Sequence, residues 1–209
     1  LISREATINI KNDDGFTPLF YAAQQNFPNI CAELLDAGAD PSICGVVSDP
    51  KSINSEADAM EDMYYGIPPL CPADFVSSDY VLSNEDLRSA FSTHSKFECP
   101  LQPEIKDATL SNVGVLSFSC IDFSEMSQIP IRKWRVIFYD MNDLACTEYT
   151  ATHSIDMDTV SHSPPQDNLI KIITAAQEGG VMSIEVLAIN ACGESDPSYK
   201  TDIDMSDIF

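Results

Sequence analysis

Positive charge is scarce in this sequence. Its 209 residues include 11 lysines and arginines against 33 aspartates and glutamates, which gives a formal net charge of -22 at pH 7. Both halves of the chain share the acidic excess, so it does not belong to one tail. A surface this negative repels nucleic-acid phosphates and anionic lipid. We therefore expect no nucleic-acid partner and no membrane insertion, whereas a basic partner is compatible with the charge, as is a simple role in solubility.

Long apolar runs are absent too, since no stretch approaches the ~20 apolar residues that span a bilayer. The seven cysteines are odd in number and include no C-x-x-C pair, which argues against a disulfide framework. A single bridge between Cys120 and Cys192 is the alternative. We expect free thiols, and hence a reducing, cytoplasmic location. The sequence opens on Leu1 without an initiator methionine, so we expect a fragment of a longer protein.

Catalytic and metal-binding patterns are missing as well. The three histidines, His94, His153 and His162, have no ligand partners at metal-binding spacing, and we expect them to be exposed loop residues. The segments Asp156–Asp158 and Asp202–Asp204 lack the glycine and the closing glutamate of a calcium loop. No dinucleotide, P-loop or nucleophile-elbow motif occurs. We therefore expect no cofactor, no metal and no enzymatic activity.

The sequence does contain a helical repeat motif at residues 15–43. Thr17–Leu19 suits the start of a first helix, because threonine caps free N–H groups and proline fits the first turn. Pro28 suits the start of a second helix, and Gly38 ends it where a left-handed backbone is wanted. The second helix has an apolar face made of Ile30, Leu34 and Leu35. This pattern resembles an ankyrin repeat.

Further copies of the motif are incomplete. Ala6 and Ala39 are one ankyrin period of about 33 residues apart, so residues 1–11 are expected to end an earlier repeat. The opening motif recurs late, at Gly66–Ala73. An ordinary helical linker over 66–90 is the alternative to a repeat there. The ranges that we expect are a partial repeat at 1–11, a full repeat at 12–44, an acidic insertion at 45–62 and a degenerate repeat at 63–91.

Beyond residue 99 the hydrophobic spacing changes from helical to alternating. The alternating runs that we expect to be strands lie at 115–121, 134–139, 169–173 and 182–189. Val186–Ser198 follows the pattern A-x-N-x-x-G-x-S-x-P-S and, with Leu101–Pro103 and Ile131–Tyr139, resembles a fibronectin type III domain. Two residues depart from that family, because Phe118 stands for its core tryptophan and Met182 for its corner tyrosine.

The resemblances imply a two-domain chain. An all-α ankyrin solenoid fragment over 1–91 is followed by a linker at 92–103, an all-β fibronectin type III, immunoglobulin-like sandwich over 100–203 and a tail at 204–209. The domain order resembles ankyrin-repeat and fibronectin type III domain-containing proteins of the wide awake/Banderuola type, and ankyrin-bearing effectors of intracellular bacteria are another possibility. The resemblance implies a non-catalytic intracellular scaffold or adaptor. A structural spacer, or a regulatory segment of an enzyme whose catalytic domain lies elsewhere, is the alternative.

Ankyrin repeats usually contact partners through hairpin tips and the first helices. By motif position, the corresponding residues are Asp13, Asp14, Phe16, Gln24 and Gln25 in the complete repeat, with Tyr64, Tyr65 and Ile67 before the degenerate one. Tyrosines beside acids would suit a peptide with basic and apolar residues. Alternatively, the tyrosines cover the core of a shortened stack.

Basic residues of the second half gather at Arg132, Lys133 and Arg135. This stripe could meet an acidic partner or the acidic insertion of the same chain. The alternative is that charges on an exposed strand discourage edge pairing. Asp140–Asp143, which follows the stripe, is expected to form a hairpin turn.

Overall fold

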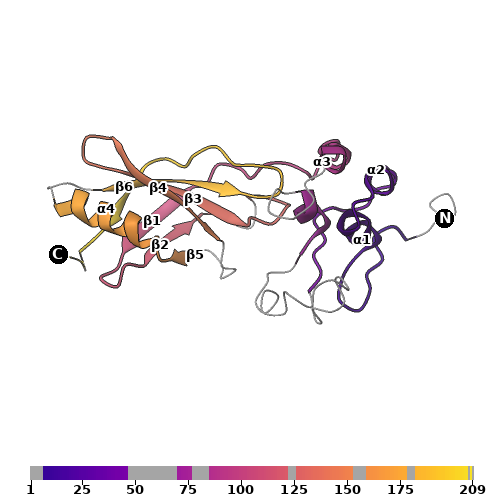
Figure 1. Cartoon of the computed structure of the whole chain (residues 1–209), viewed down its shortest axis with the longest axis horizontal. Helices are drawn as coiled ribbons and strands as arrows, with labels where there is room; N and C mark the ends of the chain where they lie inside the picture. Colours follow the sequence, from indigo (N-terminus) through magenta and orange to yellow (C-terminus); the bar gives the residue numbers. More distant parts are fainter. Residues whose placement is uncertain are drawn as a thin grey trace. The chain divides into compact units, whose positions relative to one another are not determined.

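The computed structural model describes residues 7–46, 70–76, 85–121, 126–152, 159–177, 182–206 and 208. The chain divides into two compact units (Figure 1). The N-terminal unit comprises residues 1–98 with 128–130, and the C-terminal unit comprises residues 99–127 with 131–209.

The N-terminal unit begins with two short helices, α1 (Pro18–Gln24) and α2 (Pro28–Asp36). The Oγ1 of Thr17 caps α1 by accepting a hydrogen bond from the backbone N–H of Phe20 at 3.3 Å. Each helix has a proline in its first turn, and Gly38 follows α2 with a φ of +90°. The capping prediction is therefore confirmed, because threonine, proline and glycine each occupy the backbone position that suits them.

The apolar face of α2 differs from the prediction at one residue. Leu34 and Leu35 are buried together with Cys31, but Ile30 is 49% exposed. Cys31 takes the inward position because it lies one residue further round the helix and one turn before Leu35. Ile30 and the neighbouring Phe27 instead face solvent within the part of the unit that is described.

A second pair of helical segments packs on the first. The 3-10 helix η5 (Pro72–Val76) contacts α1, and the α-helix α3 (Glu85–Ser92) contacts α2. The carboxylate of Asp74 accepts a hydrogen bond from the N–H of Cys71 at 2.8 Å and closes the start of η5. The segment η5 thus stacks on α1 and α3 stacks on α2, so the second pair follows the order of the first.

The C-terminal unit is a two-layer β structure. Its strands are β1 (Ile105–Leu110), β2 (Leu116–Cys120), β3 (Lys133–Tyr139), β4 (Ala145–Thr152), β5 (Thr159–His162), β6 (Ser183–Ile189) and β7 (Thr201–Asp204). Hydrogen bonding gives the order β4-β3-β6-β7-β1-β2-β5. Because β7 pairs antiparallel with β6 and parallel with β1, it joins a β4-β3-β6 layer to a β1-β2-β5 layer. This is a sandwich, the architecture that fibronectin type III domains share.

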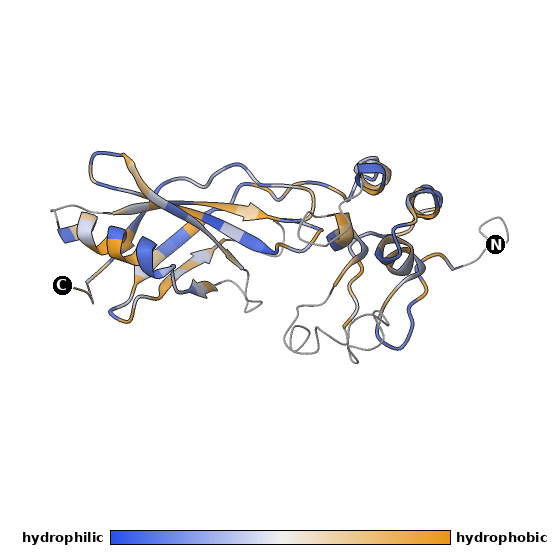
Figure 2. Cartoon of the chain, in the orientation of Figure 1, coloured by the Kyte–Doolittle hydropathy of each residue, from blue (hydrophilic) through white to orange (hydrophobic). Residues whose placement is uncertain are grey.

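The core of the sandwich follows the alternation in the sequence, and Figure 2 shows apolar residues interspersed with polar ones along the strands. Trp134, Val136 and Phe138 on β3 are fully buried, as predicted, and so are alternate residues of β2 and β6. Phe118 meets Trp134 edge-to-face with ring centroids 5.5 Å apart. Trp134 therefore fills the aromatic centre that Phe118 alone would leave smaller.

One predicted strand is wrong. Residues 169–173 belong to a helix, α4 (Gln166–Gln177), so the C-terminal unit is not all-β. Ile172 is the buried residue of α4, and Leu169 packs on the core and lies against Gly114. The spacing of these two residues is one helical turn, which places both on the face that covers the sandwich.

Candidate protein-binding surface

The turn before α1 is held by a compact set of hydrogen bonds. The side chain of Asn12 accepts from the N–H of Phe16 at 2.8 Å, while the N–H of Asn12 donates to the carbonyl of Phe16 at 3.0 Å. Gly15 supplies a φ of +86°, which favours glycine. The turn presents Asp13 at its exposed tip and Asp14 half-buried beside it. A fixed loop of this kind loses little entropy when it binds a partner.

Phe16 was predicted as a contact residue, and this prediction needs correction. Its side chain is only 3% exposed and stacks on Phe20 with ring centroids 3.9 Å apart. Leu70 completes the same cluster. The ring thus belongs to the core beneath the turn, because a large aromatic side chain at this position gains more from burial than from solvent.

Gln24 and Gln25 lie at the end of α1, where Gln25 is exposed and Gln24 half-buried. The turn and this helix are tied together by Tyr21, whose hydroxyl accepts a hydrogen bond from the side-chain amide of Asn12 at 3.0 Å. Tyr21 is 41% exposed and lies one turn before Gln25. It was missed from the sequence, although its position four residues before Gln25 places both on one helix face.

Gly45 and Leu70 form an isolated antiparallel β-bridge beside this surface. Gly45 and Leu70 exchange two backbone hydrogen bonds of 2.9 Å, and Val46 donates to the carbonyl of Asp14 at 2.9 Å. The chain therefore leaves and returns at the same point, next to the turn. Tyr64, Tyr65 and Ile67 lie outside the described residues, as does the acidic insertion beyond residue 46.

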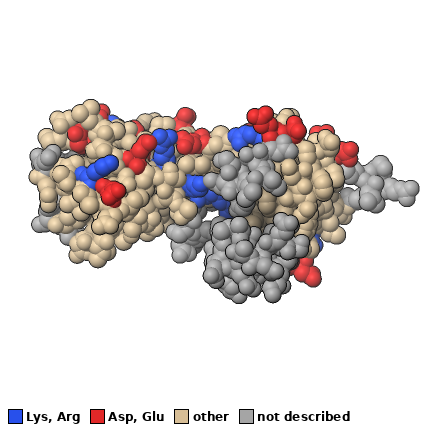
Figure 3. All heavy atoms as spheres, viewed as in Figure 1, with Lys and Arg blue, Asp and Glu red and all other residues tan. Residues whose placement is uncertain are grey.

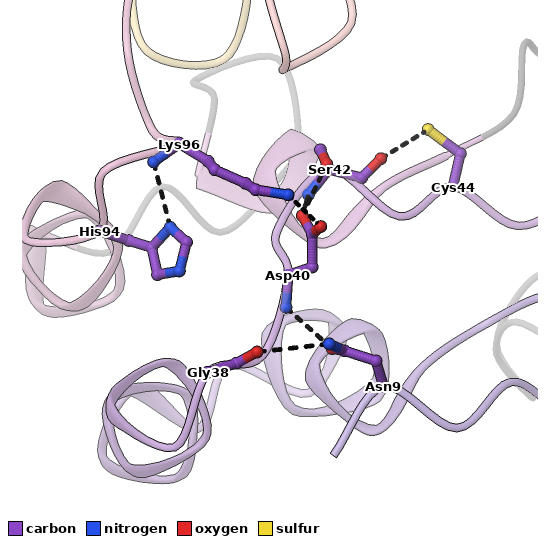
Figure 4. A network of polar contacts seen from close by, with 7 residues as sticks. All are labelled: Asn9, Gly38, Asp40, Ser42, Cys44, His94 and Lys96. Carbon is purple, nitrogen blue, oxygen red and sulfur yellow. Dashed lines mark hydrogen bonds and ion pairs between the residues drawn. The ribbon is translucent and has the colours of Figure 1, made fainter. Parts of the chain in front are cut away.

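The loops before α1 and after α2 and α3 are joined by a series of polar contacts (Figure 4). The side chain of Asn9 donates to the carbonyl of Gly38 at 3.3 Å and accepts from the N–H of Asp40 at 2.9 Å. The ammonium of Lys96 pairs with the carboxylate of Asp40, which also accepts two hydrogen bonds from Ser42. Burial alone would raise the pKa of Asp40, but the bonds from Lys96 and Ser42 outweigh it and lower that pKa. Three successive loops are thereby joined.

The basic stripe does not lie on an edge strand. Arg135 is on β3, which runs between β4 and β6, so the prediction that the stripe protects an edge is wrong. The guanidinium of Arg135 binds both oxygens of Glu148 at 3.1 and 3.0 Å and reaches Glu194 at 3.4 Å. Arg132 and Lys133 are half-buried on the same stretch. The acidic partners of Arg135 are thus Glu148 on the neighbouring strand and Glu194 in the loop after β6.

His162 is not the exposed loop residue that the sequence suggested. It ends β5, and its Nε2 lies 2.7 Å from the hydroxyl of Tyr149. Its Nδ1 is buried with no hydrogen-bond partner among the described residues. Burial lowers the pKa of His162 to about 4 and raises that of Tyr149. His153 lies outside the described residues.

Asp140 accepts hydrogen bonds from the N–H groups of Asn142 and Leu144 at 2.8 and 3.0 Å, which confirms the hairpin turn between β3 and β4. No disulfide joins Cys120 to Cys192 in the described part of the chain. Over the described ranges, no group of three or more histidine, cysteine or acidic residues could hold a metal ion. In the same ranges no helix combines the length and the apolar composition of a membrane span.

Comparison with known proteins finds one family. The ankyrin repeat family model matches residues 14–46, which contain α1 and α2. No curated protein matches the sequence significantly.

Several solved structures share low similarity with the chain. A structure described as "Myokine structure" is 9% identical with a TM-score of 0.32 and covers 51% of this chain and 97% of its own. The third fibronectin III domain of human KIAA0343 protein is 10% identical with a TM-score of 0.34, covering 54% and 87%. The FN1–FN3 domains of chicken CNTN1 are 19% identical with a TM-score of 0.30, covering 52% and 32%. The assignment of the sandwich therefore rests on its strand order.

Proposed function

We propose that this chain is a protein-binding segment of an adaptor or scaffold, without catalytic activity of its own. The observation that supports this most directly is the ankyrin repeat match at residues 14–46, since repeats of this type serve as binding frames. The exposed tip residue Asp13 and the helix-end residue Gln25 stand on a frame that Tyr21 and Asn12 hold together. A fibronectin type III-like sandwich following the repeats would add a second interaction module.

The proposal extends to the organisation of the N-terminal unit. We regard residues 63–91 as a degenerate repeat, because η5 packs on α1 as α3 packs on α2. Residues 1–11 would then end an earlier repeat, which the bonds from Asn9 to the loop after α2 support. Residues 92–103 would link this stack to the sandwich over 100–203. The odd number of cysteines and the lack of a C-x-x-C pair favour a reducing compartment such as the cytoplasm.

The partner that we propose is a protein segment with basic and apolar residues. Asp13 and Asp14 supply acceptors for basic side chains, and the exposed part of Tyr21 supplies an aromatic surface. Figure 3 shows acidic side chains interspersed with basic and uncharged ones on the visible face, so charge alone would not fix where a basic segment binds. The turn and α1 would provide the specific contacts.

The test is a binding assay with a library of displayed peptides. We expect enrichment of peptides with lysine or arginine beside aromatic or aliphatic residues, and at least tenfold weaker binding to the double variant Asp13→Ala/Gln25→Ala. Asp36→Ala is the matched control, because it also removes one exposed acid, on α2. Equal loss in the control, or no enrichment above an acidic peptide set, would contradict the proposal and favour a structural spacer.

A further inference from the structure

The direction in which the backbone groups of β4 point follows from the hydrogen bonds of β6, at the opposite side of the β4-β3-β6 layer. On β6, Val186 exchanges hydrogen bonds of 2.9 Å with the N–H and hydroxyl of Ser198. Ala188 does the same with Ser195, at 2.9 and 3.0 Å. Val186 and Ala188 therefore turn their backbone groups away from β3. In an antiparallel ladder, opposite residues either bond each other or both turn away.

This fixes which residues of β4 turn outward. Val136, which lies opposite Val186, must direct its backbone groups to the other neighbour, where Tyr149 is its partner. Because the direction alternates along a strand, Glu148 and Thr150 turn their N–H and carbonyl groups away from β3. Since β4 is the last strand of its layer among the described residues, these groups form the outer edge of the layer. Such edges are templates for a further strand.

Helix α4 covers part of this edge. It packs against β4, and the side-chain amide of Asn168 donates to the backbone carbonyl of Glu148 at 2.9 Å. The same nitrogen donates to the hydroxyl of Thr147 at 2.7 Å. The side chain of Asn168 therefore bonds the carbonyl to which an N–H group of an added strand would have to donate. The opposite end of the strand order, β5, has only four residues, whereas β4 has eight.

We propose that the β4 edge is a strand-addition surface for a second copy of this chain, and that α4 holds it closed through Asn168. A second copy fits because β4 carries one charged residue, Glu148, and Arg135 neutralises it within the same sheet. Two such strands can pair antiparallel about a two-fold axis without placing unpaired like charges together. The pairing would extend the β4-β3-β6 layer into one continuous sheet.

The test begins with Asn168→Ala, which removes both hydrogen bonds to β4. We expect the unaltered chain to sediment as a monomer, and the variant to dimerise with at least tenfold higher affinity in high salt, where repulsion between acidic chains is screened. Asn168→Asp is a second variant that loses the donor but adds an acid beside Asp167 in the first turn of α4, which favours the helix. Thr174→Ala is the control on the same helix, since Thr174 bonds only the carbonyl of Ile170; it should stay monomeric.

Thr150→Pro makes the result specific to the edge. Because the N–H of Thr150 faces outward, proline there removes an edge donor without taking one from the β3–β4 ladder. Added to Asn168→Ala, it should restore the monomer. Amide exchange at Glu148 and Thr150 should slow in the dimer of the single variant. The proposal is overturned if the folded Asn168 variants stay monomeric, or if the dimer persists with Thr150→Pro.

Discussion

At the scale of single residues, Gly45 shows how one side chain can decide local packing. A Cβ added at Gly45 would lie 2.3 Å from the Cδ1 of Phe16, whose ring is stacked on Phe20 and cannot easily move. We predict that Gly45→Ala lowers the free energy of unfolding of the N-terminal unit by about 1–3 kcal/mol, as overpacking does. Urea unfolding followed by helical circular dichroism measures this.

The control for this substitution is Val46→Ala. Val46 is the neighbouring residue and its side chain is exposed, so its loss should change the free energy of unfolding by less than about 0.5 kcal/mol. Equal stability of the Gly45→Ala protein and the unaltered chain would show that the ring of Phe16 is free to shift.

His162 makes the stability of the C-terminal unit depend on pH. Its pKa is lowered from 6.5 to about 4, so between pH 6.5 and 4 the imidazole is protonated in the unfolded chain but neutral in the folded one. The stability contributed is complete above pH 6.5 and is lost as the pH falls toward 4. We predict that the melting temperature falls less between pH 6.5 and 4 in His162→Gln, because glutamine does not titrate and can still accept a hydrogen bond from the hydroxyl of Tyr149. Parallel pH profiles of the two proteins would contradict this account.

Phe16 and His162 show that a sequence motif does not reveal whether a side chain is buried. The motif places Phe16 in a turn that ankyrin repeats use for contacts, but only packing shows that its ring fills the space above Gly45. The polar surroundings of His162 in the sequence suggest a loop, whereas its pairing opposite Leu116 places it at the end of a strand. Burial depends on the partners across the fold, which neighbouring residues do not reveal.

At the scale of elements, α4 offers a direct test, because a helix and a strand place Ile170 and Ile172 differently. In a strand the two side chains would share a face, but on α4 Ile172 is buried and Ile170 is 56% exposed. We predict that Ile172→Ala lowers the free energy of unfolding by about 2–5 kcal/mol. Ile170→Ala should change it by less than about 0.5 kcal/mol. Similar losses for both would support the strand.

Most elements could be predicted because their local signals agree with their packing. The caps of α1 and the alternation of β2, β3 and β6 each match the buried face that the structure gives. The run at 169–173 misled because four apolar residues around one lysine fit either period. Over the longer range 166–177, apolar residues at 169, 172, 173 and 176 show the helical spacing, which the short window concealed.

The candidate binding surface was predictable only in part. The repeat motif places Asp13, Gln24 and Gln25 on the turn and first helix, and the structure has them there. The tie between these two elements, from Asn12 to Tyr21, depends on side-chain geometry and not on motif position. For the same reason the ion pairs of Arg135 could not be foreseen, because its acidic partners lie 13 and 59 residues away along the chain.

At the scale of the whole molecule, the net charge of -22 opposes folding, because a compact chain brings its acids closer together. Exposed pairs such as Arg135 with Glu148 offset little of this repulsion, since exposed ion pairs each contribute about 0–1 kcal/mol. Salt should therefore stabilise the fold, because it screens more repulsion between acids than attraction within ion pairs. We predict that the free energy of unfolding by urea rises as sodium chloride increases toward about 0.15 M, where the Debye length falls to about 8 Å. Choline chloride at the same ionic strength should act equally, since screening does not depend on the cation, and a fall in stability with either salt would mean that attractive pairs outweigh the acidic excess.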